Sequence, residues 1–367
     1  MGAGGSRGEG SCCFPSRSLR KLEPLRVAVA GATGQIGYAL LPMIARGDMF
    51  GPHRRVALQC LDLNRPAVRE SMRAVEMELQ DGSFELLHEA CFTTDDAVAF
   101  KDADYAILLG AYPAEEGKEK KEIMEMNSMI FRTLGHALAR NAKKDCKILV
   151  VGHPACTNAL LCAHHAPSVP KENIFAVTRL DQNRASWQLA QRAGVSVGDV
   201  RNVIVWGTVA QAPDIDHAEI LGQPLRQVLA KREDAQWLSE DFVGAAQRRG
   251  HEVVEARQAC TALSVARAVV GHARALHCGA PPGELVSMGV WTDGNSYSIS
   301  DGLIFSMPVH CPGRGCYQVA PGLQLSKQSR HTIKEAEAEL LHDRTLIFSI
   351  LARHKSVPVT GSSPKPS

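Results

Sequence analysis

The chain has 367 residues, of which 45% are hydrophobic and 22% charged, and its 41 basic and 39 acidic side chains leave a formal charge of +2. This composition is typical of a globular protein of about two domains. It argues against nucleic-acid binding, which needs a concentrated basic face, and against a membrane span, which needs roughly 18 consecutive apolar residues. The eleven cysteines have neither CxxC pairs nor metal-ligand spacing, so we expect reduced thiols, an intracellular protein and no metal site.

Residues 1–25 are predicted to form a flexible amino-terminal extension. Gly2 with Ser6 fits the M-G-x-x-x-[ST] pattern of N-myristoylation, and the adjacent Cys12 and Cys13 are candidates for palmitoylation. Two acyl chains would tether a cytoplasmic protein stably to a membrane surface. The alternatives are an inert Gly/Ser-rich leader and a mitochondrial transit peptide.

The first structured element expected is a strand that runs into a glycine-rich turn and a helix. Residues 26–31 form a short apolar run rich in β-branched side chains, typical of a buried strand. Glycines follow at Gly31, Gly34 and Gly37, and the apolar residues after them recur at helical spacing. Such a turn lets the backbone approach a pyrophosphate at the positive end of a helix. By itself this pattern is a weak signal.

The next elements strengthen the prediction of a dinucleotide site. A second apolar run, 56–61, ends in Asp62, 25 residues after Gly37. An acid in this position accepts hydrogen bonds from the adenosine ribose and repels a 2′-phosphate, which favours NAD over NADP. Further strands are expected at 105–109 and 147–151, with helical patterns between them. This alternation predicts an α/β fold, a Rossmann doubly wound parallel sheet followed by an α/β substrate domain.

Several longer strings resemble the cytosolic type of NAD-dependent malate dehydrogenases, within the lactate/malate dehydrogenase superfamily. They include residues 29–37, 76–81, 178–185, 201–207 and 286–290, and the likeness extends from about residue 26 to 353. The resemblance implies a Rossmann domain at 26–178, a substrate and dimerisation domain at 179–355, a homodimer and a small 2-hydroxy or 2-oxo acid as substrate. Residues 356–367, rich in Pro and Ser, are predicted to be a disordered tail.

The resemblance assigns roles to individual residues. It implies that Asp181 is the carboxylate partner of a catalytic histidine and that Arg184 binds the substrate carboxylate; three residues apart on a helix, the two share a face. An ion pair within the helix is the alternative. The cofactor contacts implied are those of Gly31, Gly34, Gln35, Ile36, Gly37, Asp62, Asn127, Val151 and His153.

The catalytic histidine of the family pattern is absent. After Trp206-Gly207 the family has Asn-His-Ser-Ser, whereas this chain has Thr208-Val209-Ala210-Gln211 in a segment about two residues shorter. A valine cannot carry a proton. His217 follows, but the family also has a histidine there that is not catalytic, so His217 is a weak substitute.

Two other segments depart from the family pattern. In the loop that closes over the substrate, Ala114 and Glu115 replace arginines and Lys120 replaces the arginine that polarises the reacting carbonyl; lysine keeps the charge but not the planar fork. Lys120 is therefore either a substrate-binding residue or a solvated surface lysine. His153 stands where the family has asparagine, either as a relocated proton carrier or as a space filler.

Three functions remain open from the sequence. The chain is an NAD-dependent oxidoreductase of the malate dehydrogenase type whose activity is weak or altered, an inactive NAD-binding scaffold or sensor, or a subunit that pairs with an active paralogue. General acid–base catalysis is worth about 10²–10⁴-fold in rate. Loss of the histidine together with the first loop arginine therefore predicts little turnover of malate.

Overall fold

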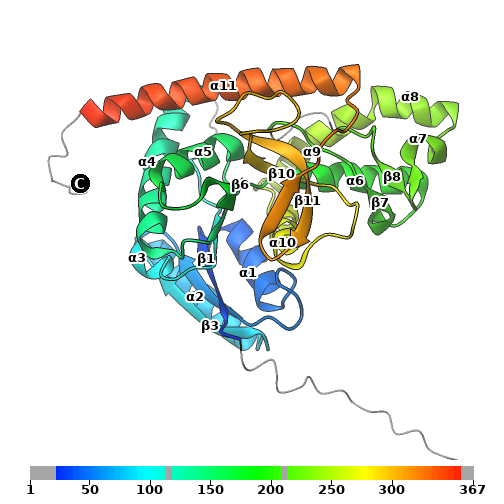
Figure 1. Cartoon of the computed structure of the whole chain (residues 1–367). Coiled ribbons are helices and arrows are strands. Elements are labelled where there is room, and N and C mark those ends of the chain that lie inside the picture. Colours follow the sequence, from blue (N-terminus) through cyan, green and yellow to red (C-terminus); the bar gives the residue numbers. More distant parts are fainter. Residues whose placement is uncertain (1–21, 113–117, 209–212, 357–367) are drawn as a thin grey trace, which may run out of the picture.

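The computed structural model describes residues 22–112, 118–208 and 213–356 (Figure 1). The strands are β1 (Leu25–Ala30), β2 (Val56–Leu61), β3 (Leu87–Thr93), β4 (Tyr105–Leu108), β5 (Lys147–Val150), β6 (Ile174–Ala176), β7 (Val200–Arg201), β8 (Glu219–Ile220), β9 (Gln223–Pro224), β10 (Val286–Trp291), β11 (Ile304–Gly313) and β12 (Cys316–Val319). The α-helices are α1 (Gln35–Ala45), α2 (Pro66–Asp81), α3 (Asp96–Ala99), α4 (Lys120–Asn141), α5 (Ala155–His165), α6 (Arg179–Ala193), α7 (Leu225–Val228), α8 (Arg232–Glu240), α9 (Phe242–Arg257), α10 (Leu263–Cys278) and α11 (Lys327–Ser356).

One large sheet organises the molecule, with strand order β12-β11-β10-β6-β5-β4-β1-β2-β3. The six strands from β6 to β3 pair in parallel, whereas β10, β11 and β12 join antiparallel through β6. The α/β fold with a doubly wound parallel sheet is thus confirmed, and the four predicted strands lie within one residue of their expected bounds. The second half of the chain extends the same sheet with three strands.

The apolar run of β1 is continuous because both faces of the sheet are covered. Val27 and Val29 belong to one hydrophobic cluster, with side chains of α1, α2 and α10, whereas Ala28 and Ala30 belong to another, with side chains of α4, α5 and α11. Successive side chains of a strand point to opposite faces. Burial on both faces explains why polar residues do not alternate with apolar ones in this strand.

The remaining elements form a smaller unit beside the large sheet. Helices α6, α8 and α9 and the short sheet β7-β8-β9 pack around a third hydrophobic cluster. Helix α11 runs across the molecule and contacts α4 and α5 (Figure 1). None of the helices described here has the length and apolar character that a membrane span requires.

Candidate cofactor and substrate site

The glycine-rich turn disfavours a side chain at two of its three glycines. At Gly31 the backbone has φ +85°, a conformation that favours glycine. A Cβ at Gly37 would lie 2.2 Å from the carbonyl oxygen of Ala32. Gly34, by contrast, is the exposed residue that precedes α1, and a Cβ there would meet only the Gly31 carbonyl oxygen at 3.4 Å. The turn therefore leaves open backbone at the amino end of a helix, where phosphate groups bind.

Asp62 ends β2 beside this turn. Its Oδ2 accepts hydrogen bonds from the backbone N–H of Thr33 at 2.9 Å and from the Thr33 hydroxyl at 2.7 Å, and its Oδ1 accepts from the N–H of Leu63 at 2.8 Å. Because a carboxylate offers about four acceptor positions, one remains for a ribose hydroxyl. The geometry fits the adenosine side of a dinucleotide.

A cavity of about 630 Å³ extends from Ile36, at the beginning of α1, toward the smaller unit. Its lining is mostly apolar. Among the described residues that line it, only Arg184 carries a permanent charge. The lining residues are Ile36, Leu109, Ala111, Tyr112, Val151, Gly152, His153, Val177, Thr178, Leu180, Arg184, Gln247, Gly250, His251, Val254, Cys260, Thr261, Val265 and Ala268. The cavity thus joins the end of the sheet to helices α6, α9 and α10.

Arg184 and Asp181 share one face of α6, as the sequence predicted. They also pair with each other: Arg184 Nη1 donates to Asp181 Oδ1 at 3.0 Å, and both side chains are largely buried. The guanidinium lies against α9 at Gly250, where a Cβ would be 3.2 Å from Nη2. Glycine at this position leaves room for the guanidinium at the cavity wall.

His153 lies between β5 and α5, and its peptide bond to Pro154 is cis. His153 is an exposed residue, and it lines the cavity. Nearby protein atoms displace water from part of the ring, and this desolvation lowers the pKa of His153; the negative charge of Asp181 opposes the shift and the positive charge of Arg184 adds to it. The imidazole is therefore neutral at pH 7, and it senses the charges of both α6 residues.

Other predicted site residues lie on the cavity wall or close to it. The Oδ1 atom of Asn127 accepts a hydrogen bond from the backbone N–H of Tyr112 at 2.7 Å. Gln35 begins α1, and its Oε1 lies 3.7 Å from the thiol of Cys260. Val151, which follows β5, contributes directly to the lining.

Lys120 is directed toward α11. Its Nζ lies 2.6 Å from Oδ1 of Asp343 and 3.3 Å from Oε1 of Glu339. Asp343 is buried, and its Oδ2 also accepts a hydrogen bond from the Thr157 hydroxyl at 2.8 Å. Burial alone would lower the pKa of Lys120, but Asp343 and Glu339 outweigh it and raise that pKa.

Some predictions fall on residues outside the described ranges, namely Gly2, Cys12, Cys13, Ala114, Glu115 and Val209. His217 is described, and its Nε2 lies 3.0 Å from the carbonyl oxygen of Gln324. It does not line the cavity.

Sequence reasoning missed one wall of the cavity. Gln247, Gly250, His251 and Val254 of α9 line it with the i, i+3, i+4, i+7 spacing of one helix face. That spacing predicts that the four residues share one face of the helix, but it does not predict which part of the protein this face packs against. Nothing in the residue types of this face identified His251 as a neighbour of the substrate site.

Comparisons with known proteins agree with this arrangement. Residues 25–175 match the model of the lactate/malate dehydrogenase NAD binding domain, and residues 178–350 match that of the alpha/beta C-terminal domain. The cytoplasmic malate dehydrogenase of Zea mays is 42% identical over 335 residues, covering 90% of this chain and 99% of the relative. The cytoplasmic malate dehydrogenase of Gallus gallus is 42% identical over 334 residues, with the same shares covered.

Solved structures show the same likeness. Malate dehydrogenase from Naegleria fowleri superposes with a TM-score of 0.83 and 36% identity, covering 90% of this chain and 99% of that one. Trichomonas vaginalis lactate dehydrogenase in complex with NADH and oxamate superposes with a TM-score of 0.82 and 33% identity, also covering 90% and 99%.

Proposed function

The chain belongs to the lactate/malate dehydrogenase family and has that family's NAD-binding domain; from this premise we propose that it is an NAD-dependent oxidoreductase of the malate dehydrogenase type with weak or altered activity. One observation carries the proposal: Ile36, which lies between Gly34 and Gly37 of the glycine turn, lines the same cavity as Arg184 and His153. A dinucleotide and a small carboxylate would therefore meet in one space. The Val209 and Ala114 replacements are the reason for expecting weak turnover.

The chain's own residues suit the cofactor. Gly31, Gly34 and Gly37 would hold the pyrophosphate against α1, and Asp62 would accept a ribose hydroxyl. His153 and Val151, with Ile36 on α1, would flank the nicotinamide end. When bound, NAD would accept or donate a hydride. A titration with NADH, read by its fluorescence, tests this assignment, and absence of binding would refute it.

The substrate side is proposed to depend on Arg184 and His153. Arg184 would turn from Asp181 to a substrate carboxylate, a bidentate pairing that suits a guanidinium. His153, neutral at pH 7, would then be the available proton carrier near Asp181. In this role it would take the hydroxyl proton in the oxidative direction, where a neutral base is required.

The activity test uses the purified chain with NADH against oxaloacetate, pyruvate and phenylpyruvate. The apolar lining with one arginine favours a monocarboxylate with an apolar side chain over a dicarboxylate. We expect slow turnover that His153→Ala removes. Turnover that survives this substitution would exclude His153 as the proton carrier. Val209→His supplies the converse test and should raise the rate if proton transfer limits it.

A second candidate is a protein that binds NAD without catalysis, as a scaffold, a sensor or the partner of an active paralogue. The Asp181–Arg184 ion pair favours it, because these two side chains are satisfied without substrate. This candidate predicts that the His153→Ala and Val209→His variants bind NADH and that neither turns over a 2-oxo acid. Turnover by the wild-type chain at ordinary dehydrogenase rates would refute it.

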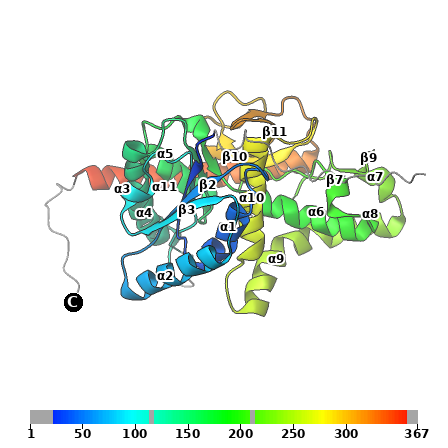
Figure 2. The ribbon, with the colours of Figure 1, turned by 90° about the horizontal axis from the view of Figure 1, so that it is seen from below.

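Assembly as a homodimer belongs to the same proposal. Tyr38, Trp187 and Leu263 are between 51% and 67% exposed and lie on α1, α6 and α10, of which α10 contacts both α1 and α6 (Figure 2). Large exposed apolar side chains on adjoining helices are typical of an interface. Light scattering after chromatography should show a dimer that Leu263→Glu disrupts and Leu221→Glu, an equally exposed control on another surface, leaves intact.

The location proposed is the cytoplasm, supported by the cytoplasmic relatives. We propose further that acylation of Gly2, Cys12 and Cys13 would tether the protein stably to a membrane surface. Labelling with a myristate analogue tests it. Equal labelling of wild type and Gly2→Ala, or no labelling at all, would refute the tether.

A further inference from the structure

A second cavity, of about 740 Å³, lies apart from the cofactor cavity and shares none of its lining residues. It is bounded by α5, α11, the segment between α5 and β6, and the end of β10. Its lining residues are Leu160, Ala163, His164, Pro167, Ser168, Val169, Pro170, Lys171, Glu172, Ile174, Trp291, Gly302, Arg344, Ile347 and Phe348. This size is within the range of small-molecule sites, about 300–1,000 Å³.

The walls of this cavity are aromatic and aliphatic. Trp291 stands at the end of β10, and Phe348, half exposed on α11, is in edge contact with the ring of His164 on α5. Lys171 Nζ lies 5.3 Å from the centre of the Trp291 ring. Large rings of this kind bind the apolar bodies of ligands.

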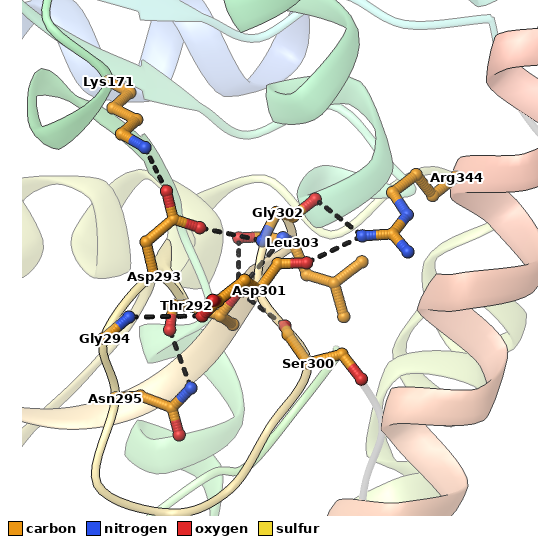
Figure 3. Close-up of polar contacts among 10 residues, drawn as sticks. All are labelled: Lys171, Thr292, Asp293, Gly294, Asn295, Ser300, Asp301, Gly302, Leu303 and Arg344. Atoms are coloured by element: carbon orange, nitrogen blue, oxygen red, sulfur yellow. Dashed lines mark hydrogen bonds and ion pairs between the residues drawn. The ribbon is translucent and has the colours of Figure 1, made fainter.

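Arg344 is a positively charged residue of the cavity lining that is held by backbone carbonyl oxygens. Its Nη1 donates to the backbone carbonyl oxygens of Asp301, at 2.7 Å, and of Gly302, at 3.5 Å (Figure 3). A Cβ at Gly302 would lie 3.1 Å from the same atom. Neutral carbonyls orient the guanidinium without neutralising it, and no carboxylate of the described residues forms an ion pair with it.

The other two charged residues of the lining are a lysine that is paired with a carboxylate and a glutamate. Lys171 is bound to Asp293, whose carboxylate also accepts from the N–H of Gly302 at 2.8 Å (Figure 3). Glu172 is the acid of the lining and opposes an anion. Arg344 thus contributes an oriented and uncompensated positive charge next to aromatic walls.

We propose that this cavity is a second binding site, for a small organic anion that joins one carboxylate or sulfonate to an aromatic or branched apolar body. The free N–H groups of Arg344 would bind the anionic group, and Trp291 and Phe348 would enclose the body. Charge complementarity argues for an anion, and the apolar walls argue against inorganic phosphate. The site does not depend on the proposed oxidoreductase activity.

The test uses 8-anilinonaphthalene-1-sulfonate, an aromatic sulfonate that fluoresces on binding, with the full-length protein and excess NAD⁺ to block the cofactor cavity. N-phenyl-1-naphthylamine, a comparable neutral molecule, is the matched probe. We expect the sulfonate to bind at least about 10-fold more tightly than the neutral probe, because hydrogen bonds to charged groups are the strong ones.

Three variants locate the binding. Arg344→Gln should weaken the sulfonate about 10-fold, and Phe348→Ala, at a half-exposed position that is safe for folding, should weaken both probes. Glu172→Gln should tighten the sulfonate a few-fold by removing a like charge. Arg330→Gln, on an exposed part of α11, is the control and should change nothing.

Equal affinity of the two probes would overturn the proposal, as would unchanged sulfonate binding in both Arg344→Gln and Phe348→Ala. Complete displacement of the sulfonate by NAD⁺ would assign it to the cofactor cavity and would overturn the proposal too. Failure of NAD⁺ to bind would bear on the proposed function alone, because the probe titrations can be read without it.

Discussion

Substitution of Lys120 by methionine separates two roles of this residue. The resemblance implies a group that polarises the substrate carbonyl, whereas the structure directs its ammonium to Asp343 and Glu339 of α11. Methionine keeps the apolar stem and removes the charge. If the contact with α11 is its role, the variant loses stability and keeps its affinity for substrate.

The magnitude follows from the burial of the two partners. Removing one partner of a fully buried pair costs about 3–5 kcal/mol, but Lys120 is 47% exposed while the Asp343 side chain is only 3% exposed. Water reaches the ammonium side, and the Thr157 hydroxyl still binds Asp343. We therefore expect a loss of about 1–2 kcal/mol, a fall of several degrees in Tm.

The assay combines thermal unfolding with steady-state kinetics for 2-oxo acids. Asp343→Asn, added to Lys120→Met, removes the unpaired buried charge and should restore most of the lost Tm. Because the pKa of Lys120 is raised above 10.5, the stability from this pair is complete below that pH and is lost as pH rises through the raised pKa. An unchanged Tm with a kcat/KM reduced about 100-fold would refute this reasoning and restore Lys120 to the substrate site.

Three further substitutions test other parts of the site. Gly37→Ala, with its Cβ 2.2 Å from the Ala32 carbonyl oxygen, should lower NADH affinity at least about 10-fold in a fluorescence titration, and unchanged affinity would contradict the tight turn. His272 is fully buried, and that burial lowers its pKa to about 3. The Tm of the wild-type protein should therefore fall as pH drops from 6.5 toward 3, and the Tm of the His272→Met variant should fall less. Superimposable profiles of Tm against pH for the two proteins would contradict this role of His272. Gly250→Ala should displace the Arg184 guanidinium and raise KM for 2-oxo acids several-fold with NADH affinity unchanged, whereas an unaltered KM would argue against substrate binding by this arginine.

The sequence by itself determined the nucleotide-binding half. Apolar runs buried on both sheet faces, glycines whose turn excludes a Cβ, and Asp62 at the end of β2 are all short-range features. Backbone sterics and strand periodicity control them, so residue types at fixed spacing are enough to predict them. The shared face of Asp181 and Arg184 follows from helical spacing in the same way.

Only the tertiary structure decided which charges meet. Lys120 binds Glu339, 219 positions away in the chain. His251 on α9 and His153 after β5 line the same cavity. Arg344 is oriented by the carbonyls of a distant loop rather than by an acid on its own helix. Such contacts depend on how helices pack against the sheet, and the free energy of packing is spread over many apolar side chains. No local pattern of residues therefore predicts these long-range contacts.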